Sequence, residues 1–118
     1  MSLNFDNNIP IYIQLSEQLK IEIISGKIAI GERLLSVRDL AFKYKVNPNT
    51  MQRAMTELEE TGLIYTERTN GKFVTNDMEL ILKYKKGYAQ NLANKFFESM
   101  CEIGFSKAEA INYLKEEE

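Results

Sequence analysis

Two helix-start signals stand close together in the middle of the chain, and they constrain the fold more than any other feature. Ser36 has an acidic residue, Asp39, three positions later, which is the spacing of a capping box. Asn47 is a favourable N-cap, and Pro48 follows it at the first helical position, where no N–H is needed. Between the two caps there is room for only one short helix and a tight turn. The sequence therefore predicts two helices joined by a turn.

A further helix is expected before this pair. Apolar residues recur at helical spacing from about Pro10 to Ser25, and Gly26 follows as a C-terminal stop. The helix that begins at Pro48 has the same spacing of apolar residues, and Gly62 ends it. Three helices are thus predicted before Gly62.

A β-hairpin is predicted directly after the third helix. Residues 63–66 and 72–75 have the composition of two short strands. Asn70-Gly71 lies between them and is a strong hairpin signal, because both residues accept a positive φ. Three helices followed by such a hairpin form a winged helix-turn-helix, which we expect over residues 1–76. The predicted fold is mostly α with this small β-hairpin.

The remaining segment, residues 77–118, is predicted to be a two-helix hairpin that dimerises. Asn76 is the expected cap of a long helix, and Ser106 with Glu109 forms the capping box of a short last one. The long helix carries an apolar stripe at helical spacing, and the short helix is too small to cover it. We expect a second copy of the chain to cover it, in a homodimer. The residues assigned to this interface are Ile81, Tyr84, Tyr88, Ala89, Leu92, Ala93, Phe96 and Met100.

Composition excludes several classes of function. The 118 residues include no histidine and one cysteine, Cys101, so neither a His-dependent catalytic triad nor a Cys/His zinc site can form. No catalytic residue, metal ligand or cofactor is predicted, and an enzyme is not expected. No apolar run approaches the roughly 20 residues of a membrane span. No signal peptide is visible, and a lone cysteine suits a reducing compartment, so we expect a cytoplasmic protein without a membrane partner.

The helix that begins at Pro48 is a candidate for reading DNA. The second helix of a helix-turn-helix can lie in the major groove with its N-terminal residues at the base edges. Asn and Gln can pair with adenine, Arg with guanine, and Thr can contact the thymine methyl group. Between residues 33 and 53, five basic residues stand against one acidic residue, although the whole chain has a net charge of −2. The candidate DNA-binding residues of this helix are Pro48, Asn49, Thr50, Gln52 and Arg53.

Several stretches of the first 75 residues together carry a resemblance to a known family. They are Pro10–Leu15 (PIYIQL), Gly31–Leu34 (GERL), Ser36–Ala41 (SVRDLA), Val46–Ala54 (VNPNTMQRA), Leu58–Ile64 (LEETGLI) and Gly71–Val74 (GKFV). With this spacing the chain resembles the GntR family of winged-helix transcriptional regulators. The segment after the hairpin is short, which is similar to the compact YtrA-type branch, in which a helical hairpin mainly dimerises.

The resemblance implies a regulator that binds double-stranded DNA as a homodimer, most often a repressor on a pseudo-palindromic operator. The resemblance is also compatible with a small-molecule inducer, whose identity it does not give. By the same resemblance, Arg38 and the hairpin near Gly71 and Lys72 match DNA-contacting positions of the family. Arg68, a basic residue of the same hairpin, is included with them.

Some alternatives stay open at this point. A winged-helix protein-interaction module that does not bind DNA would suit the acidic sequence pI of about 5.3. Such a module would more often expose apolar residues at the start of the third helix. Tyr84 and Tyr88 could line a ligand pocket, although a dimer core is favoured. The carboxylates of the third helix, Glu59 among them, are interpreted as a solvated face and not as a catalytic pair.

Overall fold

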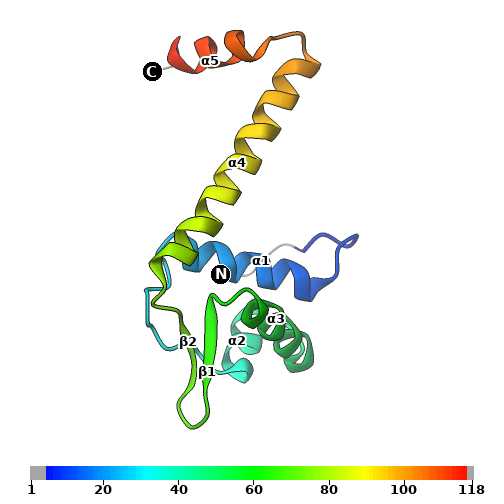
Figure 1. Ribbon diagram of the computed structural model, residues 1–118. Coiled ribbons are helices and arrows are strands. Elements are labelled where there is room, and N and C mark those ends of the chain that lie inside the picture. Colours follow the sequence, from blue (N-terminus) through cyan, green and yellow to red (C-terminus); the bar gives the residue numbers. More distant parts are fainter. Residues whose placement is uncertain (1–4, 117–118) are drawn as a thin grey trace. The chain divides into compact units, whose positions relative to one another are not determined.

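The computed structural model describes residues 5–116 and contains, over that range, five helices and one two-stranded antiparallel sheet (Figure 1). The predicted fold class, mostly α with a small β-hairpin, is confirmed. Met1–Leu82 and Lys83–Glu118 form two compact units. The predicted boundary between segments 1–76 and 77–118 lies a few residues before the boundary between these two units. Residues 1–4 and 117–118, at the ends of the predicted segments, lie outside the described residues.

The first helix, α1 (Ile11–Ile24), lies within one residue at each end of the predicted range, because Pro10 and Ser25 are its caps. The side-chain amide of Gln14 donates to the carbonyl oxygens of Asp6 and Ile9, at 2.8 and 2.7 Å. These bonds hold the chain that leads into the helix. At the other end Gly26 has a φ of 83°, which ends the helix with a conformation that glycine tolerates.

The helix-turn-helix is formed by α2 (Val37–Tyr44) and α3 (Pro48–Glu60), and both predicted caps are present. The Ser36 hydroxyl accepts from the Asp39 amide at 3.0 Å, and the Asn47 side chain accepts from the Asn49 amide at 2.7 Å. Lys45 lies in the turn with a φ of 57°, a left-handed conformation that a residue with a Cβ rarely adopts. The turn is thus tight, as predicted, and strained at Lys45.

The core of the first unit lies between the three helices and the base of the hairpin. The apolar face of α3 is buried, as its spacing predicts, and α1 packs against it. Burial of each Leu or Met side chain stabilises the fold by about 1.5–3 kcal/mol. The fully buried large side chains are Leu15, Leu19, Met51, Met55, Leu58, Leu63, Ile64 and Val74.

A polar contact also joins α1 to α2 inside this core. The Tyr44 hydroxyl donates to Glu22 Oε2 at 3.0 Å, and the Gln18 amide donates to the same oxygen at 2.9 Å. Burial and the neighbouring Glu22 carboxylate raise the pKa of Tyr44 to about 12. The contact fixes the C-terminal end of α2 just before the strained turn.

The hairpin consists of β1 (Ile64–Glu67) and β2 (Gly71–Val74), each shifted by one residue from the predicted strands. The Asn70 amide donates to the Glu67 carbonyl at 3.2 Å, so the turn spans residues 67–70. Gly71 follows with a φ of 98°, whereas among the described non-glycine residues only Lys45 has a positive φ. The predicted hairpin is therefore present, but of the two signal residues only Gly71 takes up the positive φ. A three-residue loop separates the paired Glu67 and Gly71, and only the glycine needs a positive φ.

The second unit contains most of α4 (Met78–Glu102) and all of α5 (Lys107–Glu116). The prediction that Asn76 caps α4 is wrong: the Asp77 carboxylate accepts from the Leu80 amide at 3.1 Å. The Asp77 amide itself donates to Thr75 Oγ1, at 3.0 Å, which brings the carboxylate to the cap position. The capping box before α5 is confirmed, because Ser106 and Glu109 exchange bonds of 2.9 and 3.1 Å.

Candidate nucleic-acid interface

The start of α3 presents a polar face to solvent. Asn49, Gln52 and Arg53 are exposed, and they lie on the side of the helix opposite its buried residues. Pro48 is also exposed, while Thr50 is half-buried at the edge of this face. The Asn47 side chain is occupied by the cap, which leaves Asn49 and Gln52 as the amides able to face a base. The five residues predicted from this helix therefore lie together at one helix end.

The Gln52 side chain is oriented by a neighbour on the same helix. Its amide donates to the Thr56 hydroxyl at 3.4 Å, and that hydroxyl donates to the Gln52 carbonyl at 3.0 Å. The first bond is long, so the amide retains donors and an acceptor for another partner.

Arg53 is held by an aromatic ring from another helix. Its guanidinium carbon lies 4.1 Å from the centre of the Tyr12 ring in α1, a cation–π contact. The contact restrains the guanidinium, whose N–H groups can still donate to another partner. The sequence pattern did not single out Tyr12, because its position in the helical repeat of the first helix indicated only core packing.

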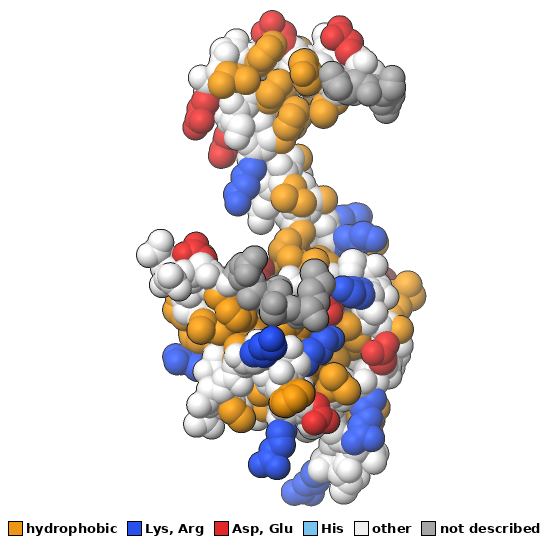
Figure 2. All heavy atoms as spheres, turned by 180° about the vertical axis from the view of Figure 1, so that it is seen from behind, with side chains coloured by type: hydrophobic (Ala, Val, Ile, Leu, Met, Phe, Trp, Pro, Cys, Tyr) orange, Lys and Arg blue, Asp and Glu red, His pale blue; other side chains and the backbone are white. Residues whose placement is uncertain are grey.

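Arg38 lies on the solvent side of α2, one turn before Phe42. Phe42 is the most exposed large apolar side chain described, at 87%. The hairpin of β1 and β2 with its turn is the wing of this fold. Figure 2 shows Lys and Arg side chains projecting from the end of the first unit where the wing lies. The basic residues of the helix-turn-helix and wing thus belong to the same unit as the polar face of α3.

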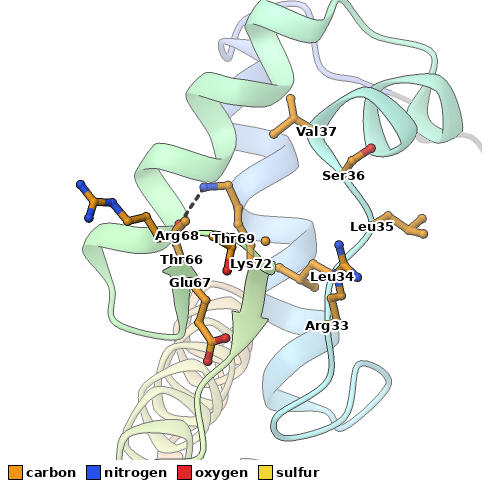
Figure 3. Close-up of a pocket in the computed structure, with 11 residues that line it drawn as sticks. Arg33, Leu34, Leu35, Ser36, Val37, Thr66, Glu67, Arg68, Thr69 and Lys72 are labelled. Atoms are coloured by element: carbon orange, nitrogen blue, oxygen red, sulfur yellow. Dashed lines mark hydrogen bonds between the residues drawn. The ribbon is translucent and has the colours of Figure 1, made fainter.

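The wing places its two predicted cations differently. Arg68 is exposed in the turn, and in Figure 3 its side chain extends away from the rest of the wing. Lys72 is half-buried instead: its ammonium is ion-paired with Glu59 of α3 and donates to Thr66 Oγ1 at 3.0 Å. The hydrogen bonds from Lys72 and Thr66 hold the pKa of Glu59 below its usual value. Glu57 and Glu60 are exposed, as a solvated face requires, whereas Glu59 is half-buried and ion-paired.

A hollow of about 310 Å³ lies between the wing and the start of α2 (Figure 3). Gly71 lines it, and a Cβ at this position would lie 3.4 Å from Nε of Arg33. Arg33 also pairs with Phe73 as an isolated bridge, which brings the segment before α2 alongside β2. The hollow is lined by Arg33, Leu34, Leu35, Ser36, Val37, Thr66, Glu67, Arg68, Thr69, Gly71 and Lys72.

The residues predicted for a dimer interface lie along α4, none of whose residues is buried. Leu92 is 68% exposed, and Ala89 and Ala93 beside it are exposed too. The other five, Ile81, Tyr84, Tyr88, Phe96 and Met100, are half-buried. Figure 2 shows hydrophobic side chains at the surface of both α4 and α5. In the short helix α5 only Ala110 is buried, so neither helix of this segment has a buried apolar face within the described residues.

Comparison with known proteins identifies the first unit. Residues 11–74 match the family model of bacterial regulatory proteins of the gntR family. The chain belongs to the GntR family. It is 32% identical over 115 residues to the uncharacterized HTH-type transcriptional regulator YhcF of Bacillus subtilis (strain 168), covering 98% of this chain and 95% of YhcF. It is also 38% identical to the HTH-type transcriptional repressor YtrA of the same organism, over 62% of this chain and 56% of YtrA.

Solved structures agree with this assignment. A GntR family transcriptional regulator from Listeria monocytogenes superposes with a TM-score of 0.86 at 42% identity, covering 95% of this chain and 98% of that one. The AraR DNA-binding domain in complex with operator ORX1 superposes with a TM-score of 0.58 at 25% identity, covering 64% of this chain and 95% of that one. The winged helix-turn-helix is thus confirmed.

The GntR chain is a transcriptional regulator with a winged-helix DNA-binding domain. The family and these relatives are regulators and not enzymes, which confirms that expectation. Over the described residues, no group of three or more acidic, cysteine or histidine side chains is placed to hold a metal ion. Among the same residues, no helix has both the length and the apolar character that crossing a membrane requires.

Proposed function

We propose that this GntR regulator binds double-stranded DNA through the start of α3 and the wing. The observation that carries the proposal is the polar, exposed face formed by Asn49, Gln52 and Arg53 at the N-terminal end of a capped helix. These side chains suit base edges in the major groove, the groove that admits a helix. The operator complexes of the AraR DNA-binding domain support the same use of this fold.

The character of α3 argues against a protein partner at this face. Large apolar side chains are exposed elsewhere in the first unit, at Leu35 and Phe42 for example, but α3 exposes none. A protein-binding helix would be expected to present such residues.

Within this interface the residues have different proposed roles. Asn49, Gln52 and Arg53 face base edges, with Pro48 and Thr50 at the rim of the same helix end. Arg38 and Arg68 contact the DNA backbone from α2 and from the wing tip, where Gly71 allows a close approach. Lys72 is half-buried and ion-paired with Glu59, so it is assigned no base.

We further propose that two chains pair through α4. Within the described part of the chain no residue of α4 is buried, and the exposed Leu92, Ala89 and Ala93 allow a second helix to approach closely. A symmetric pair of chains would place its two copies of α3, the recognition helices, in successive major grooves, about 34 Å apart on a pseudo-palindromic operator. Binding there would occlude a promoter, and repression is the proposed outcome. The name of the relative YtrA, a repressor, supports it.

An inducer, where one is bound, would act through the same pairing. A small change at the paired α4 helices would move the two recognition helices out of register with their half-sites and lower the affinity for DNA. This division of roles corresponds to a DNA-binding segment, 1–76, and a pairing segment, 77–118.

Selection of bound sequences from a pool of random DNA duplexes tests the proposal. We expect enrichment of an inverted repeat whose halves are separated by about one helical turn. Gln52→Ala should relax the preference at one position of each half. Gln90→Ala is the matched control, because Gln90 is an exposed glutamine of α4 bonded to Asn94 four residues later, at 3.0 Å. Absence of any enriched sequence would contradict the proposal.

A further inference from the structure

We propose that Glu59 and Lys72 are a positioning pair that fixes the wing against the recognition helix. Lys72 then supports DNA binding through the placement of the wing, and its ammonium does not contact a DNA phosphate. This inference rests on the proposed function, since it assigns a role within the same DNA-binding surface.

The contacts of the pair join three elements. Glu59 lies in the last turns of α3, and its Oε1 accepts from the Thr66 hydroxyl of β1 at 2.6 Å and from the Lys72 ammonium of β2. Lys72 also donates to Thr66 Oγ1, at 3.0 Å. Thr66 and Lys72 are directly paired across the two strands. One carboxylate oxygen of the recognition helix is therefore bonded to both strands at the same level of the hairpin.

The surroundings of Lys72 favour this role over a phosphate contact. The side chain of Lys72 is 18% exposed and that of Glu59 is 35% exposed, so the pair is partly shielded from water. Turning Lys72 to a phosphate would break two bonds and leave the Glu59 carboxylate facing the DNA without its cation. Arg68, exposed at the wing tip, can reach a phosphate without breaking the pair.

The position of the pair explains why the wing needs it. The turn residues Arg68, Thr69 and Asn70 are all exposed, so nothing buried holds the tip of the wing. The base of the hairpin is held by the buried Ile64 and Val74, which are paired with each other. Lys72, Thr66 and Glu59 lie between this base and the tip. They fix the orientation, relative to α3, of the outer part of the wing that carries Arg68 and Gly71.

Affinity measured against salt concentration, on the full-length chain and the operator sequence from the selection, tests the inference. Lys72→Met and Glu59→Gln should each lower the affinity by roughly fivefold to tenfold. The double variant should be no worse than either single one, because both remove the same ion pair. Neither should change the slope of log affinity against log salt. Lys72→Arg, which can still pair with Glu59, should restore the affinity.

Two variants calibrate the measurement. Arg68→Met should reduce the salt slope by about 0.9 per chain, or about 1.8 for the proposed pair of chains, if each Arg68 guanidinium neutralises one phosphate. Lys20→Met is the matched control, since Lys20 is also an ion-paired lysine, bonded to Glu17 at 2.9 Å in α1, outside the proposed interface. It should leave both affinity and slope unchanged. Thermal unfolding of each variant checks that the domain remains folded.

The opposite assignment gives a different pattern. If Lys72 contacted a phosphate, Lys72→Met would reduce the salt slope as Arg68→Met does, and Glu59→Gln would raise the affinity by releasing the lysine and removing a negative charge. That result would overturn the inference and leave the proposed function standing. Failure of the unmodified chain to bind any selected duplex would instead contradict the proposed function.

Discussion

The two units of this GntR regulator differ in how far their apolar side chains are buried. In the first unit, Leu15, Met55 and Leu58 are fully buried, and the exposed face of α3 is polar. In the second unit, Ala110 is the only buried apolar residue among those the structure describes, and α4 buries none. The first unit thus has a core of its own, whereas the apolar surface of the second is left for the second chain that we propose.

The largest effect is expected from a charge on the uncovered stripe. Leu92→Asp should convert a dimer into monomers, because a symmetric interface would lose two buried leucines at about 1.5–3 kcal/mol each. Light scattering at a fixed protein concentration measures the change. Gln90→Asp, on another face of α4, should leave the dimer intact. Equal masses for the unmodified chain and Leu92→Asp would contradict the proposal that the apolar side chains of α4 pair two chains.

A core substitution sharpens the same contrast. Leu58→Ala should lower the free energy of unfolding by about 2–5 kcal/mol, because it leaves a cavity in a fully packed site. Leu92→Ala makes the same chemical change at a residue that is 68% exposed. Measured at a concentration where the chain is monomeric, it should lower the unfolding free energy much less. Denaturant unfolding of both variants provides the test. Similar losses of unfolding free energy would show that Leu92 is as well packed within one chain as Leu58.

The polar contact inside the first unit predicts a smaller loss. Tyr44→Phe removes the hydroxyl that donates to Glu22 and leaves a buried carboxylate with one fewer donor. The free energy of unfolding should fall by about 1–3 kcal/mol. Tyr113→Phe, at an exposed tyrosine of α5, is the control and should have little effect. An unchanged stability of Tyr44→Phe would show that Glu22 gains nothing from the bond.

The turn between α2 and α3 predicts a gain. Lys45→Gly should raise the free energy of unfolding by up to about 1 kcal/mol, because glycine adopts the φ of 57° without strain. Lys43→Gly, two residues earlier inside α2, should lower it by about 1 kcal/mol. Thermal unfolding of the two variants separates these opposite signs. A loss for both would mean that Lys45 makes a contact that outweighs its strain.

The smallest effect is a dependence on pH. The pKa of Glu59 is lower in the folded chain than its ordinary value of 4.5, so its ion pair stabilises the fold above that pH. The stabilisation is lost as the pH falls through the depressed folded pKa. Unfolding measured against pH should show the unmodified chain more stable than Glu59→Gln near neutrality, with the difference shrinking in acid. A difference that grows toward acid would contradict this assignment.

Local signals explain why much of the fold was predictable. The caps at Ser36, Asn47 and Ser106 act on amides two or three residues away, so the sequence alone locates them. The helical repeat in α3 likewise predicts its buried face. The errors arose where two neighbouring residues compete for one role. Asp77 rather than Asn76 caps α4, because Thr75 holds the Asp77 amide, and in the wing Gly71 alone, not Asn70, has a positive φ.

The candidate site was less predictable than the fold. Its position at the start of α3 follows from the motif, and the residue types follow from base chemistry. The partners of its side chains do not, because they come from distant parts of the chain. Tyr12 reaches Arg53 from α1, and Glu59 takes up Lys72, thirteen residues away, only once the hairpin has folded. Contacts of this kind become visible only with the tertiary structure.

In the proposed division of roles, the first unit reads DNA while the second pairs two chains. The mass of the complex between the full-length chain and a duplex carrying the selected inverted repeat tests this division most directly. We predict two chains per duplex for the unmodified protein, and loss of this complex for Leu92→Asp at the same concentration. A single chain per duplex, or a complex of two chains that Leu92→Asp leaves unchanged in mass and affinity, would contradict it.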